Sequence, residues 1–346
     1  MKKESVVSAS PFRDWCGPAK VFRTQAKRLA QRLRKIGVES VTVGLSGGLD
    51  SALCLFVAVE AFRLLGLPGR GIRVFTMPGF GTTGRTRGNA EKLCAGLGLK
   101  LETIDIRKAC LQHFKDIGQD PSRHDVTFEN AQARMRTMIL MDKANQTGGI
   151  VLGTGDMSEI ALGWCTYNGD HMSMFGVNAG VPKTVVRDVC RWIASAMAKR
   201  GGKRASMVAG AIKDIVKTPV SPELLPSKGG IIAQRTEDRI GPYELHDFFI
   251  WRTVVCGERR RAIRAAARRA FDGVYSDAEI ERWLEVFCRR LVTQSFKRNC
   301  APDGIKVFPA YFGPDDWHIP SDSQYRGDIV QPGDMRKGAS RRGGAC

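Results

Sequence analysis

The amino-acid sequence predicts an α/β fold, with a doubly wound and mainly parallel sheet and a C-terminal helical extension. Short apolar stretches of strand length alternate with helical segments, and the expected strands are residues 38–45, 71–77, 100–106 and 149–153. Glycine-bearing turns, LSGGLDS and PGFGTTG, follow the first two of them. Alternation of this kind is typical of a parallel sheet with helices on both faces, in which ligands bind at the carboxyl ends of the strands.

The segments around these strands are expected in a definite order. Residues 1–19 form an irregular arm, and residues 20–36 form a basic amphipathic helix because apolar side chains recur there at helical spacing. Residues 52–65 carry apolar side chains on all sides and no helix breaker, which predicts a largely buried helix. Further helices are expected over residues 128–147 and from Lys183 onwards.

The character of the chain changes after Arg200. The stretches GGKRASMVAG (201–210) and TPVSPELLPSKGG (218–230) predict loops, because Gly and Pro interrupt them. Helices are expected again at residues 242–256, 258–271 and 276–298. The last segment, 322–346, is rich in Gly, Arg and Asp without periodicity, and we expect it to be disordered.

Composition excludes several classes of protein. The chain has 346 residues, 43% of them hydrophobic, which is enough to bury a large core. No run of about 18 apolar residues is present, so no membrane span is expected, and the basic N-terminus lacks the apolar region of a secretory signal. The ten cysteines are scattered singly, without C-x-x-C or metal spacing. That pattern favours reduced thiols in the cytoplasm over disulfides or a zinc site.

The chain is strongly basic. Its 54 Lys and Arg against 35 Asp and Glu give a formal net charge of +19. Such a surface suits nucleic acid, a polyanionic substrate or no partner at all. The basic runs lack interleaved aromatic residues and any known binding motif, so we do not expect nucleic acid as a partner.

The turn LSGGLDS combines two glycines, two serines and an aspartate between a strand and a helix. Gly47 and Gly48 let the backbone approach a ligand closely, and the N–H groups and dipole of the helix start favour an anion. Ser46 and Ser51 add hydroxyl donors. Asp50 beside an anion indicates a bridging cation, and Mg²⁺ on a phosphate is the usual one. The simpler alternative, a helix cap, needs only a single Ser or Asp.

Three further stretches place polar groups where a core helix would not need them. Asn130 and Arg134 lie one helical turn apart and share a face, for which a solvated polar stripe is the alternative. Thr154 ends a buried strand, and Glu159 follows in the next turn or helix, where it can also be an ordinary first-turn acid. Lys183 opens a helix after a proline, and a cation at this unfavourable position indicates an anion nearby.

Taken in order, these motifs resemble those of the NAD synthetase family. The turn is similar to the SGGxDS pyrophosphate loop of the ATP pyrophosphatase superfamily, whose members split ATP between the α and β phosphates and adenylylate a substrate. The resemblance runs from about residue 12 to about residue 323 and is closest to the synthetase half of the glutamine-dependent enzymes. It rests on the stretches SGGLDSAL, MPGFGTT, ENAQARMRTMILM, GTGDMSEIALGWCTY, GVNAGVPKT, PVSPELLP, GPYELHDF and SFKRNCAPDGIKV.

The resemblance implies a domain organisation. Residues 20–200 would form a sheet domain of the ATP pyrophosphatase (adenine nucleotide alpha hydrolase-like) type, preceded by an N-terminal arm at 1–19. Residues 201–321 would be a loop and helical extension that completes the substrate site, and 322–346 the disordered tail. A homodimer or a higher homo-oligomer is implied as well.

The same resemblance implies roles for single residues. The implied ATP-binding residues are Gly44, Leu45, Ser46, Gly47, Gly48, Leu49, Asp50, Ser51, Thr154 and Lys183. The implied deamido-NAD-binding residues are Asn130, Arg134, Glu159, Trp164, Cys165, Thr166, Tyr167 and Lys297. Asp50 and Glu159 would hold Mg²⁺, and together with Lys183 they would be catalytic.

An NAD synthetase of this kind would amidate deamido-NAD with ATP as co-substrate. The nicotinate carboxylate attacks the α-phosphorus, and ammonia then attacks the acyl-adenylate, so that pyrophosphate and AMP are released. Similar enzymes carry a glutaminase domain before this region, whereas only a short arm precedes the first expected helix here. We therefore expect ammonia as the nitrogen donor, the alternative being a separate glutaminase that docks on the surface.

Two other functions are alternatives at this point. An RNA-modifying ATP pyrophosphatase that adenylylates a tRNA base would explain the net charge of +19, but such enzymes commonly use paired cysteines or an added RNA-binding module. A regulatory protein that only binds nucleotide would need the turn at residues 45–51 but neither Glu159 nor Lys297.

Overall fold

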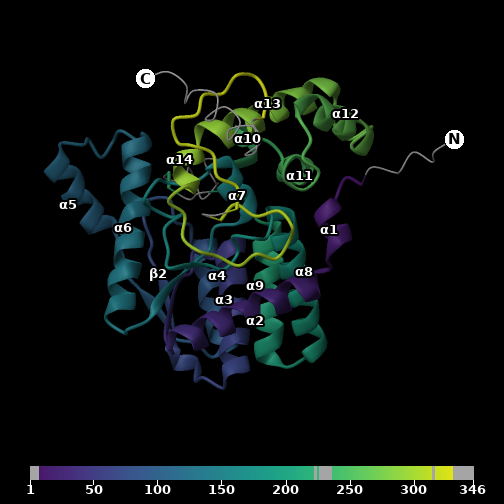
Figure 1. Ribbon diagram of the computed structural model, residues 1–346. Helices are drawn as coiled ribbons and strands as arrows, with labels where there is room; N and C mark the ends of the chain where they lie inside the picture. Colours follow the sequence, from purple (N-terminus) through teal and green to yellow (C-terminus); the bar gives the residue numbers. More distant parts are fainter. Residues whose placement is uncertain (1–7, 222–223, 226–235, 314–315, 330–346) are drawn as a thin grey trace.

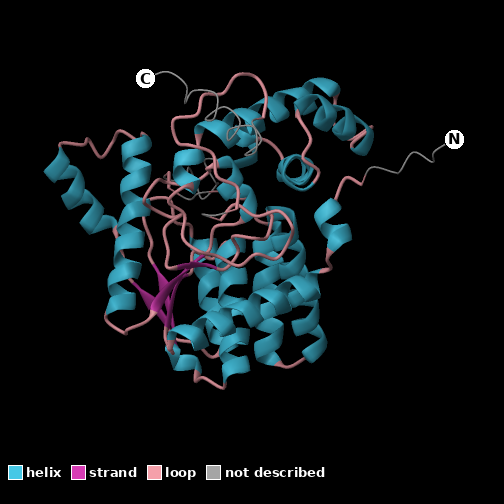
Figure 2. Cartoon of the chain, in the orientation of Figure 1, coloured by secondary structure: helices cyan, strands magenta, loops and turns pink. Residues whose placement is uncertain are grey.

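The computed structural model describes residues 8–221, 224–225, 236–313 and 316–329. At its centre lies a five-stranded parallel sheet in the order β3-β2-β1-β4-β5, drawn as magenta arrows in Figure 2. The strands are β1 (Val41–Gly44), β2 (Ile72–Thr76), β3 (Leu101–Thr103), β4 (Ile150–Gly153) and β5 (Phe175–Gly176). This architecture confirms the predicted fold class.

The first strand is central because it finds a partner on both sides. Val41 is in register with Ile72 of β2 and with Ile150 of β4. The side chains of Val41, Thr42 and Val43 are all buried, as expected for a strand that is covered on both faces. Each of the four predicted strands is confirmed within its predicted range. β5 was not predicted, because its two residues are too few to show a period.

Helices cover both faces of the sheet. On one face α6 (Val126–Asn145) contacts β1 and β4 and carries α5 (Arg107–Ile117) on its outer side (Figure 1). The opposite layer consists of α2 (Pro18–Ile36), α3 (Leu49–Leu65), α4 (Gly84–Leu97), α8 (Lys183–Arg200) and α9 (Lys203–Lys217). A 3-10 turn (Gly69–Gly71) precedes β2, and the short helix α7 (Met157–Leu162) follows β4. Among the described residues, no helix is long and apolar enough to cross a lipid bilayer.

The predicted loop at residues 201–210 is wrong, because most of this stretch belongs to α9. Only Gly201 and Gly202 interrupt the helical path; their φ angles of 71° and 85° end α8 and redirect the backbone. Val208 and Ile212 of α9 are buried one helical turn apart, and the helix packs against α4 and α8. Two adjacent glycines therefore separate two helices here and open no longer loop.

The predicted irregular arm contains a short helix, α1 (Pro11–Trp15). Its Phe12 is 2% exposed and meets the rings of Trp251 and Phe308 edge to face, with ring centroids 4.9 and 5.1 Å apart. This buried aromatic side chain fixes the arm to the C-terminal part of the chain. Residues 1–7 of the predicted arm lie outside the described residues.

The C-terminal part of the chain is helical and lies over α7, at the top of Figure 1. The predicted helix at 276–298 is interrupted at Gln294. Of the predicted loop at 218–230, the structure describes residues 218–221 and 224–225, which form neither helix nor strand. The helices are α10 (Thr236–Ile240), α11 (Tyr243–Ile250) with a π-helical turn (Trp251–Val255) after it, α12 (Arg260–Ala270), α13 (Asp277–Thr293) and α14 (Ser295–Arg298).

The predicted tail begins with well-defined contacts. Tyr325 donates a hydrogen bond of 2.7 Å to a carboxylate oxygen of Glu285 in α13, and Ile329 is 1% exposed. Over residues 322–329 the structure thus differs from the predicted disorder, because an aromatic and an aliphatic side chain anchor this stretch. Residues 330–346 lie outside the described part of the chain. The predicted domain boundaries stay predictions.

Part of the positive charge is paired within the C-terminal helices. Arg264 of α12 lies 3.1 Å from a carboxylate oxygen of Glu281 in α13, and Arg268 lies 2.7 Å from Asp277. Arg260 also donates to Glu281. Such largely exposed pairs add little stability each. They nevertheless give several arginines of one basic run a partner inside the protein.

His246 of α11 is a buried histidine whose pKa is lowered to about 4, chiefly because it is removed from water. Its Nε2 lies 2.6 Å from the carbonyl oxygen of Ile240, so Nε2 carries the proton of the neutral ring. An unfolded histidine titrates near pH 6.5, so between about pH 6.5 and 4 the unfolded chain binds a proton that the folded chain does not. Stability is therefore expected to fall as the pH drops through this window, by roughly 3 kcal/mol in all.

The substitution His246→Gln is expected to remove this part of the pH dependence, because glutamine can still donate to Ile240 but does not titrate. The measurement is the free energy of unfolding in urea at about pH 7 and about pH 4.5, with the exposed His113→Gln as a matched control. If His246→Gln loses stability toward acid as steeply as the wild type, the buried histidine is not the cause.

Candidate active site

A cavity of about 580 Å³ opens at the carboxyl edge of the sheet, where β1, β2 and β4 end. The strand ends Gly44, Thr76 and Gly153 form part of its wall. All of the predicted site residues except Arg134 and Lys183 lie in its lining: Gly44, Leu45, Ser46, Gly47, Gly48, Leu49, Asp50, Ser51, Asn130, Thr154, Glu159, Trp164, Cys165, Thr166, Tyr167 and Lys297. The structure thus brings together residues that are up to about 250 positions apart in the sequence.

The turn between β1 and α3 is held in one conformation by a close backbone contact. Gly47 has a φ of 86°, and a Cβ at this position would lie 2.0 Å from the carbonyl oxygen of Thr86. Only glycine fits there. Gly48 then forms the N-cap of α3, and no side chain among the described residues caps this helix. The N–H groups of its first turn are therefore open to an anion in the cavity.

The two serines of the turn pair with each other. Ser46 Oγ and Ser51 Oγ are 3.1 Å apart, Ser51 Oγ donates to the Gly48 carbonyl, and Ser46 Oγ accepts from Gly48 N. The side chains of Leu45 and Leu49 are buried in the core. The turn thus combines a fixed, apolar foundation with hydroxyl and amide groups at the cavity.

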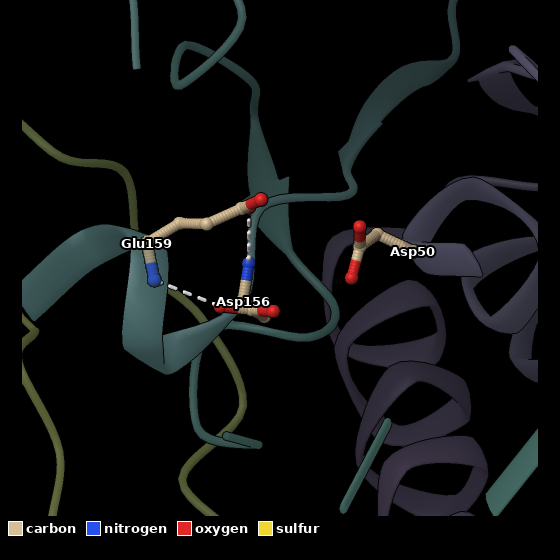
Figure 3. Close-up of side chains that lie close together, drawn as sticks. All are labelled: Asp50, Asp156 and Glu159. Atoms are coloured by element: carbon tan, nitrogen blue, oxygen red, sulfur yellow. Dashed lines mark hydrogen bonds between the residues drawn. The ribbon is translucent and has the colours of Figure 1, made fainter. Parts of the chain in front are cut away.

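Three carboxylates converge beside this turn. Asp50 comes from the first turn of α3, and Asp156 and Glu159 come from the start of α7 (Figure 3). One oxygen of each lies within 4.8 Å of one oxygen of the others. Asp156 accepts from the backbone N–H of Glu159 at 2.8 Å, and Glu159 accepts from that of Asp156 at 3.3 Å. This reciprocal capping of α7 fixes both side chains.

The cluster has the chemistry of a site for a hard divalent cation. Carboxylate oxygens are the ligands that Mg²⁺ prefers in proteins. The second oxygen of Asp50, Oδ1, is buried and makes no hydrogen bond within the described residues, so it retains lone pairs for a ligand. Asp50 and Glu159, the predicted metal ligands, therefore fit Mg²⁺, and Asp156 joins them as a third carboxylate.

Lys183 opens α8 and pairs with all three carboxylates. Its Nζ lies 2.7 Å from Asp50, 2.9 Å from Asp156 and 2.8 Å from Glu159, and its side chain is fully buried. The predicted anion beside Lys183 is thus confirmed, but it is supplied by the protein. Burial would lower the pKa of Lys183, yet the three carboxylates outweigh burial and raise it well above its usual value, so the lysine is charged.

Burial also raises the pKa values of two of the carboxylates. Removal from water raises the pKa of Glu159 to about 7, against the opposing effect of the Lys183 ammonium. The same causes raise the pKa of Asp156 well above its usual value. Carboxylates with raised pKa values in a cavity are typical of functional sites. Such a cluster lowers the stability of the fold, so proteins keep one mainly where it serves binding or catalysis.

A further buried carboxylate, Asp247, holds the first turns of α7 and α8 in place. Asp247 of α11 accepts from Ser158 Oγ and, at 3.0 Å, from the backbone N–H of Thr184. Ser158 Oγ in turn accepts from the backbone N–H of Lys183 at 2.9 Å. Asp247, in the motif GPYELHDF, thereby positions the backbone of Lys183 through Ser158. Asn178 adds hydrogen bonds to the carbonyl oxygens of Asp50 and Thr154, at 2.9 and 3.0 Å.

The opposite wall of the cavity is the loop of residues 164–167. Thr166 Oγ1 donates to Asn130 Oδ1 of α6 at 2.8 Å, and Arg134 Nε donates to the carbonyl oxygen of Tyr167 at 3.2 Å. Asn130 and Arg134 therefore share a face, as predicted, and both hold this loop. The guanidinium of Arg134 is on the exposed side of the loop, away from the cavity lining.

Cations from α13 and α14 support the same loop from the other side. Lys297 Nζ donates to the carbonyl oxygens of Gly163 and Cys165, at 3.0 and 2.7 Å. Arg290 donates to the carbonyl oxygen of Leu162 at 2.9 Å and lies over the ring of Trp164, 5.2 Å from its centroid. Both cations also line the cavity. They neutralise the negative end of α7 and keep the loop in position.

Sequence reasoning missed several residues of this site, among them Asp156 and Arg290. Asp156 stood in the quoted motif GTGDMSEIALGWCTY, and its spacing to Glu159 is that of a capping box, a signal that could have found it. Arg290 gave no local signal, because it sits in an ordinary amphipathic helix more than a hundred positions away from the loop it supports.

Comparison with known proteins identifies similar chains. A family model for NAD synthase matches residues 21–247. The glutamine-dependent NAD(+) synthetase of Mycobacterium leprae (strain TN) is 39% identical over 344 residues, which cover 92% of this chain and 50% of that protein. The enzyme of the same description from Thermotoga maritima is 31% identical over 330 residues, 93% of this chain and 50% of that protein. The chain thus spans about half the length of the curated relatives it matches.

A solved structure shares the fold. The glutamine-dependent NAD(+) synthetase from Cytophaga hutchinsonii superimposes with a TM-score of 0.70 at 18% sequence identity, over 88% of this chain and 54% of that chain. At this identity the likeness concerns the fold alone.

Proposed function

The chain belongs to the NAD synthase family, and we propose that it amidates deamido-NAD to NAD with ATP, through an acyl-adenylate. The observation that carries the proposal is one cavity with two unlike ends. At one end lie the turn of residues 46–51 and a cluster of carboxylates with a buried lysine, which suit phosphates and their metal. At the other end lies an aromatic and amide wall, which suits a pyridine ring. Family membership gives no support to the tRNA-modifying alternative.

The phosphate end would bind ATP. The open N–H groups of α3 are donors for its phosphates. The hydroxyl of Ser46 can join them by turning away from Ser51, whose own hydroxyl donates to the Gly48 carbonyl. Asp50 and Glu159, with Asp156 beside them, would hold Mg²⁺, which when bound supplies positive charge to the phosphates. Thr154, at the end of β4, lines the cavity between the two ends.

The loop end would bind deamido-NAD. Trp164 and Tyr167 line this end, and aromatic rings attract a planar cation such as the pyridinium ring of the nicotinate group. One face of Trp164 is already covered by Arg290. Asn130 and Thr166 are already hydrogen-bonded to each other at 2.8 Å and therefore form a fixed polar edge. Lys297 and Arg290 add positive charge without a carboxylate partner among the described residues, which suits the anionic groups of the dinucleotide.

The reaction would need positioning and charge stabilisation more than a protein nucleophile. In the first step an oxygen of the nicotinate carboxylate forms a bond to the α-phosphorus, and the bond from this phosphorus to the β-phosphate oxygen breaks, which releases pyrophosphate. In the second step ammonia attacks the acyl carbon, loses a proton to solvent, and AMP leaves. Two anions meet in the first step, and the helix start and the ammonium of Lys183 lower their repulsion.

We propose ammonia as the nitrogen donor of this chain. A glutaminase needs a reactive thiolate, whereas burial raises the pKa of Cys165 and of Cys190, the cysteines beside the site. A separate glutaminase that docks on α2 is the alternative source. Assembly as a homodimer or a higher homo-oligomer stays a prediction from the family resemblance.

The test is product analysis with the purified chain. With deamido-NAD, ATP, Mg²⁺ and ammonium we expect NAD, AMP and pyrophosphate in equal amounts, and with glutamine free of ammonium we expect no NAD. At fixed total ammonium the rate should rise several-fold between about pH 7 and about pH 9, because the free base becomes more abundant. Sustained NAD formation from glutamine alone would contradict the ammonia proposal. Pyrophosphate release that depends on tRNA and not on deamido-NAD would contradict the function itself.

A further inference from the structure

Lys183 pairs with the same three carboxylates that a divalent cation would use. We propose that the Lys183 ammonium is a built-in competitor of free divalent metal at Asp50, Asp156 and Glu159, so that metal binds firmly only together with a nucleotide. The inference rests on the proposed function, because that function brings both metal and nucleotide phosphates to this place.

The geometry makes the competition direct. An ammonium group has three N–H donors, and the three carboxylates each contribute one oxygen, at 2.7, 2.9 and 2.8 Å from Nζ. Lys183 Nζ donates hydrogen bonds to Asp50 and Glu159 and forms an ion pair with Asp156. These are the same three groups whose oxygens lie close enough for a single cation. A metal ion bound by these carboxylates would lie close to the ammonium, and the two positive charges repel each other and share the same negative partners.

Burial makes the competition strong. The side chains of Lys183 and Asp156 are fully buried, and those of Asp50 and Glu159 are 20% exposed. Carboxylates in such a place are costly unless a cation is paired with them. Lys183 provides that cation permanently. A metal that takes over the carboxylates would leave a buried ammonium without a charged partner, since the ring of Tyr243, whose centroid is 5.3 Å from Nζ, carries no charge.

Nucleotide phosphates would remove this obstacle. They bring negative charge to the open start of α3, where Asp50 is also located, and can thus serve as the new partner of Lys183. The lysine would then change from a counter-ion of the carboxylates to a counter-ion of the phosphates. Metal and nucleotide are therefore expected to bind cooperatively, and free metal weakly.

The test is Mn²⁺ binding without nucleotide, measured by electron paramagnetic resonance of the free ion and by calorimetry. The substitution Lys183→Met removes the ammonium and keeps a side chain of similar length. We expect it to bind Mn²⁺ about tenfold or more tightly than the wild type. The control is Lys35→Met, which removes the same unit of charge from the exposed end of α2 and should leave Mn²⁺ affinity unchanged.

A second pair of variants covers the case in which Lys183→Met fails to fold because its carboxylates repel one another. The double variant Lys183→Met/Asp156→Asn removes one buried carboxylate with the lysine, and it is compared with Asp156→Asn alone. The double variant should again bind Mn²⁺ more tightly. Equal affinity with and without Lys183, or no Mn²⁺ binding by either, would overturn the proposal. The measurement uses neither ATP nor deamido-NAD, so failure of the proposed function would show separately, as absence of NAD formation.

Discussion

The substitution Asp50→Asn is expected to lower the rate of pyrophosphate release by about a thousandfold or more. The carboxylate stands in the first turn of α3, beside the phosphate-binding turn, and its buried Oδ1 has no hydrogen-bond partner within the described residues. An amide has nearly the same shape but cannot contribute a charged ligand oxygen. The loss should therefore fall on catalysis, while the free energy of unfolding changes by less than about 2 kcal/mol.

Two measurements separate this effect from a loss of structure. Circular dichroism and urea unfolding should show that Asp50→Asn keeps the wild-type fold, because Asp156 and Glu159 remain to pair with Lys183. Asp142→Asn, on the exposed side of α6, is the matched control and should release pyrophosphate at the wild-type rate. Near-normal turnover of Asp50→Asn would exclude this carboxylate from metal binding.

The substitution Lys297→Met is expected to raise the KM for deamido-NAD about tenfold to a hundredfold and to leave the KM for ATP within about twofold. Lys297 Nζ donates to the carbonyl oxygens of Gly163 and Cys165 and so fixes the loop at the end of the cavity proposed for the nicotinate group. Both of its hydrogen bonds go to this loop and neither goes to the turn of residues 46–51, where we propose that ATP binds.

The test of Lys297→Met compares its effect on the KM for deamido-NAD with its effect on the KM for ATP. Initial rates are measured with each substrate varied against a saturating amount of the other. Lys306→Met, which removes a lysine that pairs with Asp316 away from the loop, is the control and should change neither KM. An equal rise in both KM values would mean that Lys297 supports the whole site and not the loop.

Local patterns were sufficient to predict the phosphate end of the site. β1 and α3 are read from apolar runs, and the turn between them from Gly47, Gly48 and Asp50, because strand, turn and helix follow one another within a single short stretch. Glu159 was found for the same reason, close behind β4. Asp156 was overlooked there, although its capping distance to Glu159 is visible in the sequence. Asn178 was overlooked too, because its contacts with Asp50 and Thr154 join segments that are distant in the sequence.

The loop end could not be predicted in the same way. Lys297 was assigned to it through the family resemblance, but its actual contacts, two backbone carbonyl oxygens, depend on how α14 packs against α7. Arg290 depends on the same packing and has no sequence signal of its own. The glycine pair Gly201 and Gly202 led to the wrong prediction of a longer loop. The residues after it have enough helical periodicity to form α9.

The C-terminal end of α7 is held in place by side chains from a distant part of the chain. The last carbonyl oxygens there accept from cations beyond residue 247, where the family match stops: that of Ala161 from Arg298, that of Leu162 from Arg290 and that of Gly163 from Lys297. The position of the loop at residues 164–167 therefore depends on side chains that lie outside the matched segment. A gene fusion that exchanged only the first 247 residues would transfer Asn130 and the loop of residues 164–167 without the three cations that hold the end of α7 in place.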